Sequence, residues 1–161
     1  MRRIKITAGI FLLIFTAVAM VGTADYIKAQ ERQQEIAGKV LRFHVRANSD
    51  AGEDQNLKLK IRDAVGVLLS EKLRDVTDLE ACKRVVNDNM RGIVCAAERV
   101  IEQEGYDYPV EAYLAKVDFP DKTYGMYTFP AGRYEALELV IGSGTGHNWW
   151  CVMYPNMCFA G

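Results

Sequence analysis

The stretch KVLRFHVRANSD, residues 39–50, marks the start of the folded part of this chain. Apolar and polar side chains alternate strictly along it, and this period of two predicts a β-strand with one buried face and one face in water. The Asn-Ser-Asp end of the stretch is a typical signal for a turn and a helix start. The apolar positions are Leu41, Phe43, Val45 and Ala47, and the polar positions are Arg42, His44 and Arg46.

Two helical patterns follow this strand. Asp50 and Glu53 have the spacing of a capping box, which predicts a first helix that ends near Leu73. Thr77 and Glu80 predict the start of a second helix in the same way. Apolar residues recur at helical spacing through both segments, so we expect each helix to be continuous and to bury one face.

The remainder of the chain has the composition of a β-sheet. All four prolines and 12 of the 16 aromatic residues lie beyond Gly105. The expected strands are residues 110–119, 124–129, 134–141 and 149–154. We expect the middle two to pair as a hairpin around residues 130–132, and the glycine loop at 142–146 to be a hairpin connection. The order of strand, two helices and three to four strands predicts an α+β fold, with the helices on one face of a mainly antiparallel sheet.

The N-terminus has the pattern of a membrane-targeting helix. Three basic residues at positions 2, 3 and 5 precede residues 6–24, a stretch of 19 residues without a charge that ends in small residues. This pattern predicts a secretory signal peptide. The stretch also approaches the roughly 20 residues that span a bilayer, so cleavage and retention as a signal anchor both remain open. In either case the remainder of the chain is expected outside the cytoplasm.

The charge balance changes once the targeting segment is set apart. The whole chain has 161 residues and a formal net charge of −1, whereas the 137 residues after position 24 carry 17 basic and 21 acidic residues, or −4. We expect residues 25–38 to form a polar stalk and residues 39–161 to form a single domain. A mildly acidic domain of this kind is not expected to bind nucleic acid.

The four cysteines suggest one local disulfide. On a continuous helix Cys82 and Cys95 would lie about 20 Å apart, beyond the roughly 7 Å between Cα atoms that a disulfide allows. Cys151 and Cys158 flank a proline turn, and export permits a disulfide between them. We then expect Cys82 to be a small core residue. Cys95 is expected to be either a free thiol or an intermolecular link.

The titratable residues do not predict a catalytic, cofactor or metal site. Cys151 or Cys158 with His44 or His147 could supply a nucleophile and a base, but a structural disulfide and solvated histidines explain these residues better. The carboxylates of Asp50 and Asp54 could form an acid–base pair or a calcium site, but capping of a helix explains them better. The glycine loop lacks the Lys and Ser/Thr that complete a phosphate-binding loop.

A recognition surface is the remaining candidate for a site. Trp149 and Trp150 are adjacent, so on a strand they point to opposite faces and one of them can anchor a partner at the surface. Polar side chains around the junction of the first strand and the first helix complete this surface. The predicted surface consists of His44, Arg46, Asn48, Asp50, Asp54, Lys58, Arg62, Trp149 and Trp150.

Several motifs together resemble the stage II sporulation protein R family. In the first half they are FHV and ANSD at 43–50, EDQ at 53–55, LKLK at 57–60 and RDAV at 62–65. In the second half they are YPV at 108–110, FP at 119–120, KTYG at 122–125, PAG at 130–132, YEAL at 134–137, NWWCV at 148–152 and YP at 154–155. The resemblance covers about residues 39–159, nearly all of the part expected to be exported.

The resemblance implies a function that no single motif indicates. Members of this family are made in the forespore of endospore-forming bacteria and are exported into the space between the two engulfing membranes. There they activate a membrane-embedded aspartic-type protease of the mother cell, which then cleaves pro-sigma E. The resemblance therefore implies a signalling protein rather than an enzyme. The alternatives are an exported small hydrolase, with Cys151 or the carboxylates of Asp50 and Asp54, and a cell-wall glycan-binding module, with Trp149 or Trp150.

Overall fold

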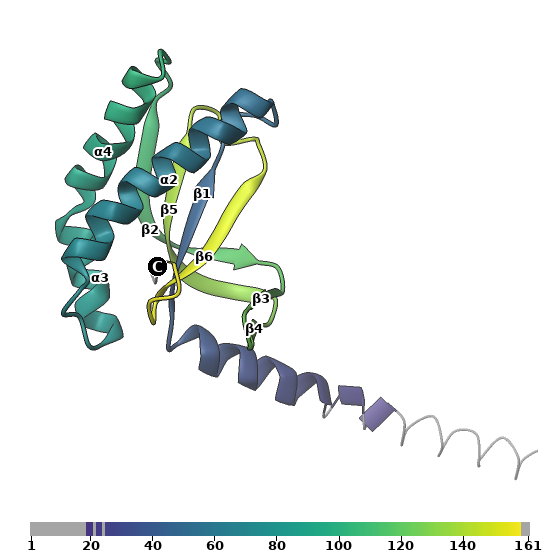
Figure 1. Cartoon of the computed structure of the whole chain (residues 1–161). Helices are drawn as coiled ribbons and strands as arrows, with labels where there is room; N and C mark the ends of the chain where they lie inside the picture. The colour runs from purple at the N-terminus through teal and green to yellow at the C-terminus, as the bar shows by residue number, and fades with distance from the viewer. Residues whose placement is uncertain (1–18, 21, 24, 159–161) are drawn as a thin grey trace, which may run out of the picture. The chain divides into compact units, whose positions relative to one another are not determined.

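The computed structural model describes residues 19–20, 22–23 and 25–158 (Figure 1). The chain divides into two compact units, residues 1–36 and 37–161. In the first unit residues 25–36 are helical, and the side chains of Tyr26 and Ile27 are exposed. Most of the predicted targeting segment, residues 1–24, lies outside the described residues. Among the residues that are described, no helix is both long enough and apolar enough to cross a bilayer.

The second unit combines three helices with two sheets. Its helices are α2 (Gly52–Lys72), α3 (Leu79–Asp88) and α4 (Met90–Gln103). Its strands are β1 (Leu41–Arg46), β2 (Val110–Phe119), β3 (Lys122–Tyr124), β4 (Tyr127–Phe129), β5 (Gly132–Ile141) and β6 (Asn148–Tyr154). The main sheet has the order β2-β5-β1-β6, and β3 pairs only with β4. β1 is parallel to β5, whereas the β2–β5 and β1–β6 pairs are antiparallel.

The three helices cover one face of the main sheet (Figure 1). Because side chains alternate along a strand, every second residue of each strand points toward these helices. The strand residues of this core are Leu41, Phe43, Val45, Val110, Leu137, Leu139, Ile141 and Met153. The helices contribute Leu57, Ile61, Val65, Leu69, Cys82, Val86, Ile93, Ala97 and Ile101. This arrangement confirms the predicted α+β fold with helices on one face of a mainly antiparallel sheet.

β1 is buried on both faces, so the expectation of a polar face in water is wrong. Arg42 is fully buried and His44 is 3% exposed. The reason is the position of β1 between β5 and β6 in the sheet, with the β3–β4 hairpin and several aromatic side chains over its second face. Of the three polar residues, Arg46 alone keeps a partly exposed side chain.

Both predicted capping boxes are replaced by other contacts. The N-cap of α2 is Ala51, which has no polar side chain to cap the helix, and the carboxylate of Asp50 accepts the backbone N–H of His147 instead. Asp78 caps α3, and its carboxylate accepts the N–H of Ala81 at 2.7 Å. The expected single second helix is also divided: α3 ends at Asp88 and α4 begins at Met90.

Asn89 lies at this break between α3 and α4. Its side chain donates a hydrogen bond back to the carbonyl of Val85 at 2.8 Å. A bond of this kind competes with the helix ladder and favours a helix end, so a short polar side chain ends α3 within an otherwise continuous apolar stripe.

Two expected hairpins are paired differently. Residues 122–124 pair with 127–129, whereas β5 pairs with β2 and with β1. The glycine loop at 142–146 is not a hairpin connection either, because β1 lies between β5 and β6. The loop therefore passes the end of β1 to reach the far side of that strand.

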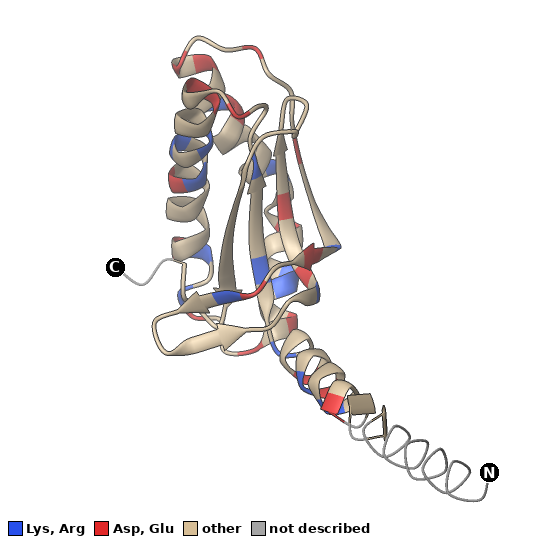
Figure 2. Ribbon diagram, turned by 90° about the vertical axis from the view of Figure 1, so that its right-hand side faces the viewer, with Lys and Arg blue, Asp and Glu red and all other residues tan. Residues whose placement is uncertain are grey.

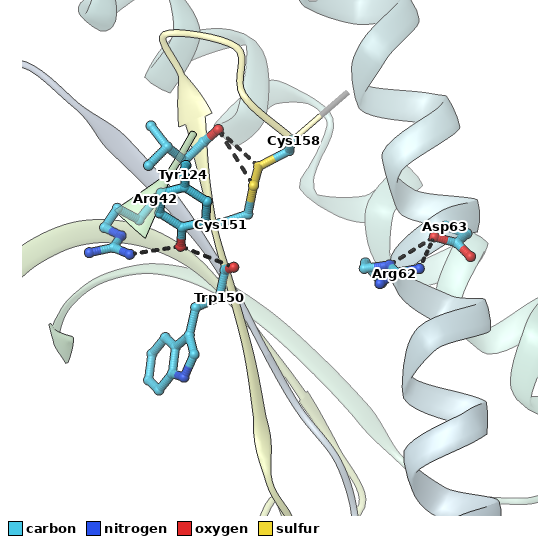
Figure 3. Close-up of a disulfide and its surroundings, with 8 residues drawn as sticks. Arg42, Arg62, Asp63, Tyr124, Trp150, Cys151 and Cys158 are labelled. Atoms are coloured by element: carbon cyan, nitrogen blue, oxygen red, sulfur yellow. Dashed lines mark hydrogen bonds and ion pairs between the residues drawn. A yellow bond between two sulfur atoms is a disulfide. The ribbon is translucent and has the colours of Figure 1, made fainter. Parts of the chain in front are cut away.

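A disulfide joins Cys151 in β6 to Cys158 in the turn that follows, with Cα atoms 5.8 Å apart (Figure 3). Cys82 and Cys95 are free thiols. Cys82 lies in the core, where burial raises the pKa of its thiol to about 11. Cys95 is partly exposed.

The second face of β1 is organised around the guanidinium of Arg42. Its Cζ atom lies 3.9 Å from the ring centroid of Phe119 and 4.9 Å from that of Tyr134. Nη2 donates to the hydroxyl of Tyr124 at 3.1 Å, and this hydroxyl donates to the carbonyl of Trp150 at 3.1 Å (Figure 3). Nε and Nη1 of Arg42 have no hydrogen-bond partner among the described residues. Cation–π contacts and one hydroxyl thus hold a buried cation that connects β1 to the β3–β4 hairpin.

Substitution of Arg42 separates the contribution of its volume from that of its charge. Arg42→Ala leaves a cavity among the aromatic rings and is expected to lower the free energy of unfolding by about 2–4 kcal/mol. Arg42→Met fills the same space without unpaired donors and is expected to change it by less than about 1 kcal/mol. Urea denaturation of the three proteins measures both values. An equal loss in both variants would show that the charge, rather than the volume, is required.

Candidate functional site

The second face of the sheet forms an open hollow of about 510 Å³ beside the region covered by the β3–β4 hairpin. β1, β2, β5 and β6 all contribute side chains to it, and the glycine loop forms one wall. Its lining includes His44, Arg46, Val117, Glu138, Asn148, Trp150 and the segment 144–146.

Glu138 is the charged centre of this hollow. Its side chain is 8% exposed, and Oε1 lies 3.3 Å from Nδ1 of His44 and 3.4 Å from Nη1 of Arg46. Arg46 also donates from Nε to the carbonyl of Gly144 at 2.9 Å, which connects the glycine loop to the carboxylate. Buried charges in proteins are ordinarily paired, and here the charge of Glu138 is paired with that of Arg46.

His44 is held as a neutral ring. It stacks on Trp150 with ring centroids 3.8 Å apart and an angle of 13° between the planes. Burial lowers the pKa of His44 from 6.5 to about 4, against the smaller opposing effects of Asn148 and Glu138. At neutral pH the ring is therefore uncharged, and it packs as an aromatic group.

The hollow does not contain the Cys–His pair weighed as a hydrolase site. Cys151 lies opposite Phe43 in the β1–β6 register, and side chains alternate between the faces of a strand. Cys151 therefore faces the helices, whereas His44 faces the hollow. The sulfur of Cys151 is also bonded to that of Cys158. Among the described residues no group of three His, Cys, Asp or Glu side chains is arranged to hold a metal ion.

The junction of β1 and α2 holds the glycine loop in place. Asn48 accepts the N–H of Ser143 on Oδ1 at 2.9 Å, and its carbonyl accepts the hydroxyls of Ser143 and Thr145. Lys58 donates to the carbonyl of His147 at 2.8 Å. Asp50 also contacts Nδ1 of His147. The residues predicted as a polar recognition surface are therefore used largely to position the loop that forms a wall of the hollow.

Asp54 is the buried acceptor of this junction. Its Oδ2 accepts the hydroxyl of Ser49 at 2.5 Å and the side-chain N–H of Asn48 at 2.9 Å. The hydrogen bond from Ser49 lowers the pKa of Asp54 below 3.8, against burial, which raises it, and Asn48 lowers it further. The carboxylate therefore remains charged at neutral pH and orders the first turn of α2, although it is not a side-chain cap.

The glycines of the loop are required by close approach. A Cβ atom on Gly146 would lie 2.1 Å from the carbonyl oxygen of Ser49, and one on Gly142 would lie 2.3 Å from Oδ1 of Asn48. Gly142 also has a φ of +57°, a conformation that side chains disfavour. The loop can therefore approach the β1–α2 junction only because every second residue from 142 to 146 is a glycine, which has no side chain.

Arg62 and Trp149 lie at a separate place. They line a groove of about 390 Å³ along α2, together with Gly66, Val67 and Cys158. The guanidinium of Arg62 is 5.1 Å from the ring of Trp149 and also pairs with Asp63 at 2.6 Å. Arg62 and Asp63 lie well apart from the Arg42–Tyr124–Trp150 chain (Figure 3). The nine predicted residues thus belong to three places: the hollow, the β1–α2 junction and this groove.

Some residues of the site are not predicted by the sequence patterns. Glu138 lies between Leu137 and Leu139, and this alternation predicts a carboxylate in water, so the sequence does not indicate its burial. Phe119, whose ring lies 4.5 Å from that of Trp150, gives no signal either, because only the strand order brings β2 to this face. Ser143 was visible as part of the glycine loop, but its partner Asn48 is 95 residues away.

Alanine substitution tests the fit of the loop. Gly146→Ala and Gly142→Ala are each expected to lower the free energy of unfolding by more than about 2 kcal/mol, because each Cβ collides with the junction. Gly92→Ala in α4 is the matched control, since its Cβ meets only Leu68 Cδ2 at 3.8 Å. It is expected to stabilise the protein by about 0.5–1 kcal/mol. If all three variants unfold at the same urea concentration, the close approach of the loop is wrong.

The buried histidine predicts a dependence of stability on pH. Between about pH 4 and 6.5 the unfolded chain protonates His44, whereas the folded protein does not, so the free energy of unfolding rises with pH across this window. His44→Gln removes this part of the slope and leaves that of the other groups. Urea denaturation at several pH values measures the difference between the two proteins. Identical slopes would contradict the burial of a neutral ring.

Comparison with known proteins identifies relatives of this chain. The family model described as stage II sporulation protein R matches residues 37–161. Stage II sporulation protein R of Bacillus subtilis (strain 168) is 36% identical over 153 residues, which cover 93% of this chain and 68% of that protein. No solved structure matches the chain. Since the family model spans the whole second unit and the relative covers nearly all of the chain, the protein belongs to the stage II sporulation protein R family.

Proposed function

We propose that this chain is an exported signalling protein of sporulation, which activates a membrane-embedded aspartic-type protease of the mother cell and so triggers the processing of pro-sigma E. The observation that carries the proposal is the family match across residues 37–161. The forespore is the proposed source, and the space between the two membranes is the proposed destination. The basic and apolar N-terminal segment is the proposed route of export.

The arrangement of polar groups supports a role in recognition rather than in chemistry. In the hollow the His44 ring is neutral and stacked, and the Glu138 carboxylate is paired with Arg46. A general base or nucleophile must be able to reach a substrate, whereas these groups are committed to contacts within the protein. What reaches the surface is the rim: the guanidinium of Arg46, the side chain of Asn148 and the partly buried Trp150. We propose this rim as the surface that contacts the protease.

Reconstitution in a bacterium that does not sporulate tests the function. The full chain is co-expressed with a candidate membrane protease of the mother cell and with pro-sigma E, and processing is followed by immunoblot. Cleaved sigma factor is expected only when all three proteins are present. If the chain is stably exported and no processing occurs above the level without it, the signalling function is wrong.

The same system tests the hollow as the contact surface. Val117→Lys places a long charged side chain on the wall of the hollow, outside the Glu138 network. It is expected to reduce processing about tenfold or more, since the partner would have to bury an unpaired charge. Glu111→Lys is the control, because residue 111 lies on the same strand and face but does not line the hollow. Equal processing by both variants, with normal export, would place the contact elsewhere.

A further inference from the structure

The tip of the β3–β4 hairpin, residues 124–127, exposes two large apolar side chains. Met126 is 87% exposed and Tyr127 is 57% exposed. In the described part of the second unit the only other large apolar side chain more than half exposed is Val67, at 71%, which lies on α2 beside the groove with Trp149. Two adjacent apolar side chains at the end of a protruding turn suggest a contact with another apolar phase.

The strands next to the turn are held in place by hydrogen bonds. Tyr124 is held by the buried guanidinium of Arg42 and by the carbonyl of Trp150. The hydroxyls of Thr123 and Thr128 bond across the two strands at 2.9 Å. Gly125, with a φ of +59°, makes the tight turn that directs Met126 outward.

The chemistry of the hairpin suits the lipid interface. Between residues 122 and 132 the only charged side chain is Lys122, and the two strands are correspondingly almost free of charge colours in Figure 2. Tyrosine is enriched at the boundary between lipid and water, and a lysine there can extend its amine to the headgroups. A protein contact would ordinarily surround such anchors with a flat polar rim, whereas here the anchors stand on a narrow turn.

Retention of residues 6–24 as an anchor would keep this tip near a membrane. Arg42, which holds Tyr124, lies two residues after Val40. The hairpin therefore lies beside the first residues of β1, where the chain enters the second unit (Figure 1). The 16 residues from 25 to 40 span about 24 Å as a helix and at most about 55 Å when extended. Tyr26 and Ile27 are exposed directly after the uncharged stretch 6–24, which is typical of an interfacial anchor.

We propose that Met126 and Tyr127 insert into the lipid interface of the membrane in which residues 6–24 are retained as an anchor. This inference rests on the proposed export of the chain, with residues 6–24 retained as a signal anchor rather than cleaved. Tethering gives the tip a high effective concentration at the bilayer, so a weak insertion of two side chains is sufficient. The exported part carries a net charge of −4, so anionic lipid does not attract it. The proposed contact is therefore apolar and does not require anionic lipid.

A fluorescent probe at the tip tests the insertion. The full chain is reconstituted in phosphatidylcholine vesicles as a Cys95→Ser variant, in which the remaining free thiol, Cys82, is buried in the core. Met126→Cys carries an environment-sensitive fluorophore, and Val67→Cys carries the same fluorophore as the matched exposed control. Emission at position 126 is expected to shift to the blue, and brominated acyl chains are expected to quench it several-fold more than emission at position 67.

Two results would overturn the proposal. The first is equal emission and equal quenching at the two positions. The second is shielding of position 126 only after a membrane protease is added to the vesicles, which would make the tip a protein contact. Since the vesicles of the first test contain no protease, this result is independent of the processing assay, and each proposal can fail without the other.

Discussion

The central place of β1 in the main sheet is the constraint on which the rest of the structure depends. The helices cover one face of β1, and its other face carries Arg42 and His44, which are also buried. Each of these polar groups therefore needs a second layer. Arg42 is enclosed by aromatic rings and by the hydroxyl of Tyr124, and His44 is stacked on Trp150 and adjoins Glu138. The hairpin thus helps to enclose Arg42, whereas His44 lies in the wall of the open hollow.

The same constraint explains the glycine loop. Since β1 separates β5 from β6, the connection between those strands passes the end of β1, where α2 also begins. Three segments meet there within hydrogen-bond distance, and backbone groups that are buried must be paired. Asn48 satisfies groups of the loop, and Asp54 satisfies Asn48 and Ser49. The polar motif that appears in the sequence as a surface is therefore mainly a structural junction, and the exposed rim of the hollow carries the recognition that we propose.

The local patterns of the sequence predict the order of the elements, the helices on one face and the disulfide between Cys151 and Cys158, because spacing along the chain determines each of these. They do not predict strand neighbours. The alternation in β1 is the same whether its polar face meets water or aromatic rings, and only side chains from β2, β6 and the β3–β4 hairpin decide between them. Asn89 shows a second limit, since one side-chain bond to Val85 ends α3 where the apolar stripe continues. The sequence predicts site residues that lie in the motif at the strand–helix junction. It does not predict those that a distant strand supplies, such as Phe119.

The pairing of β1 with β6 also governs when the domain can fold. The strand at the beginning of the unit takes one neighbour from residues 132–141 and the other from residues 148–154, close to the C-terminal end. Contacts so distant along the chain form late, because the loop between them must close first. If the chain is exported as we propose, its folded unit emerges in sequence order, and β1, its helices and β2 would reach the far side before the sheet can be completed. Only the passage of the last residues would complete it, so arrival of the whole chain and acquisition of the folded surface would coincide.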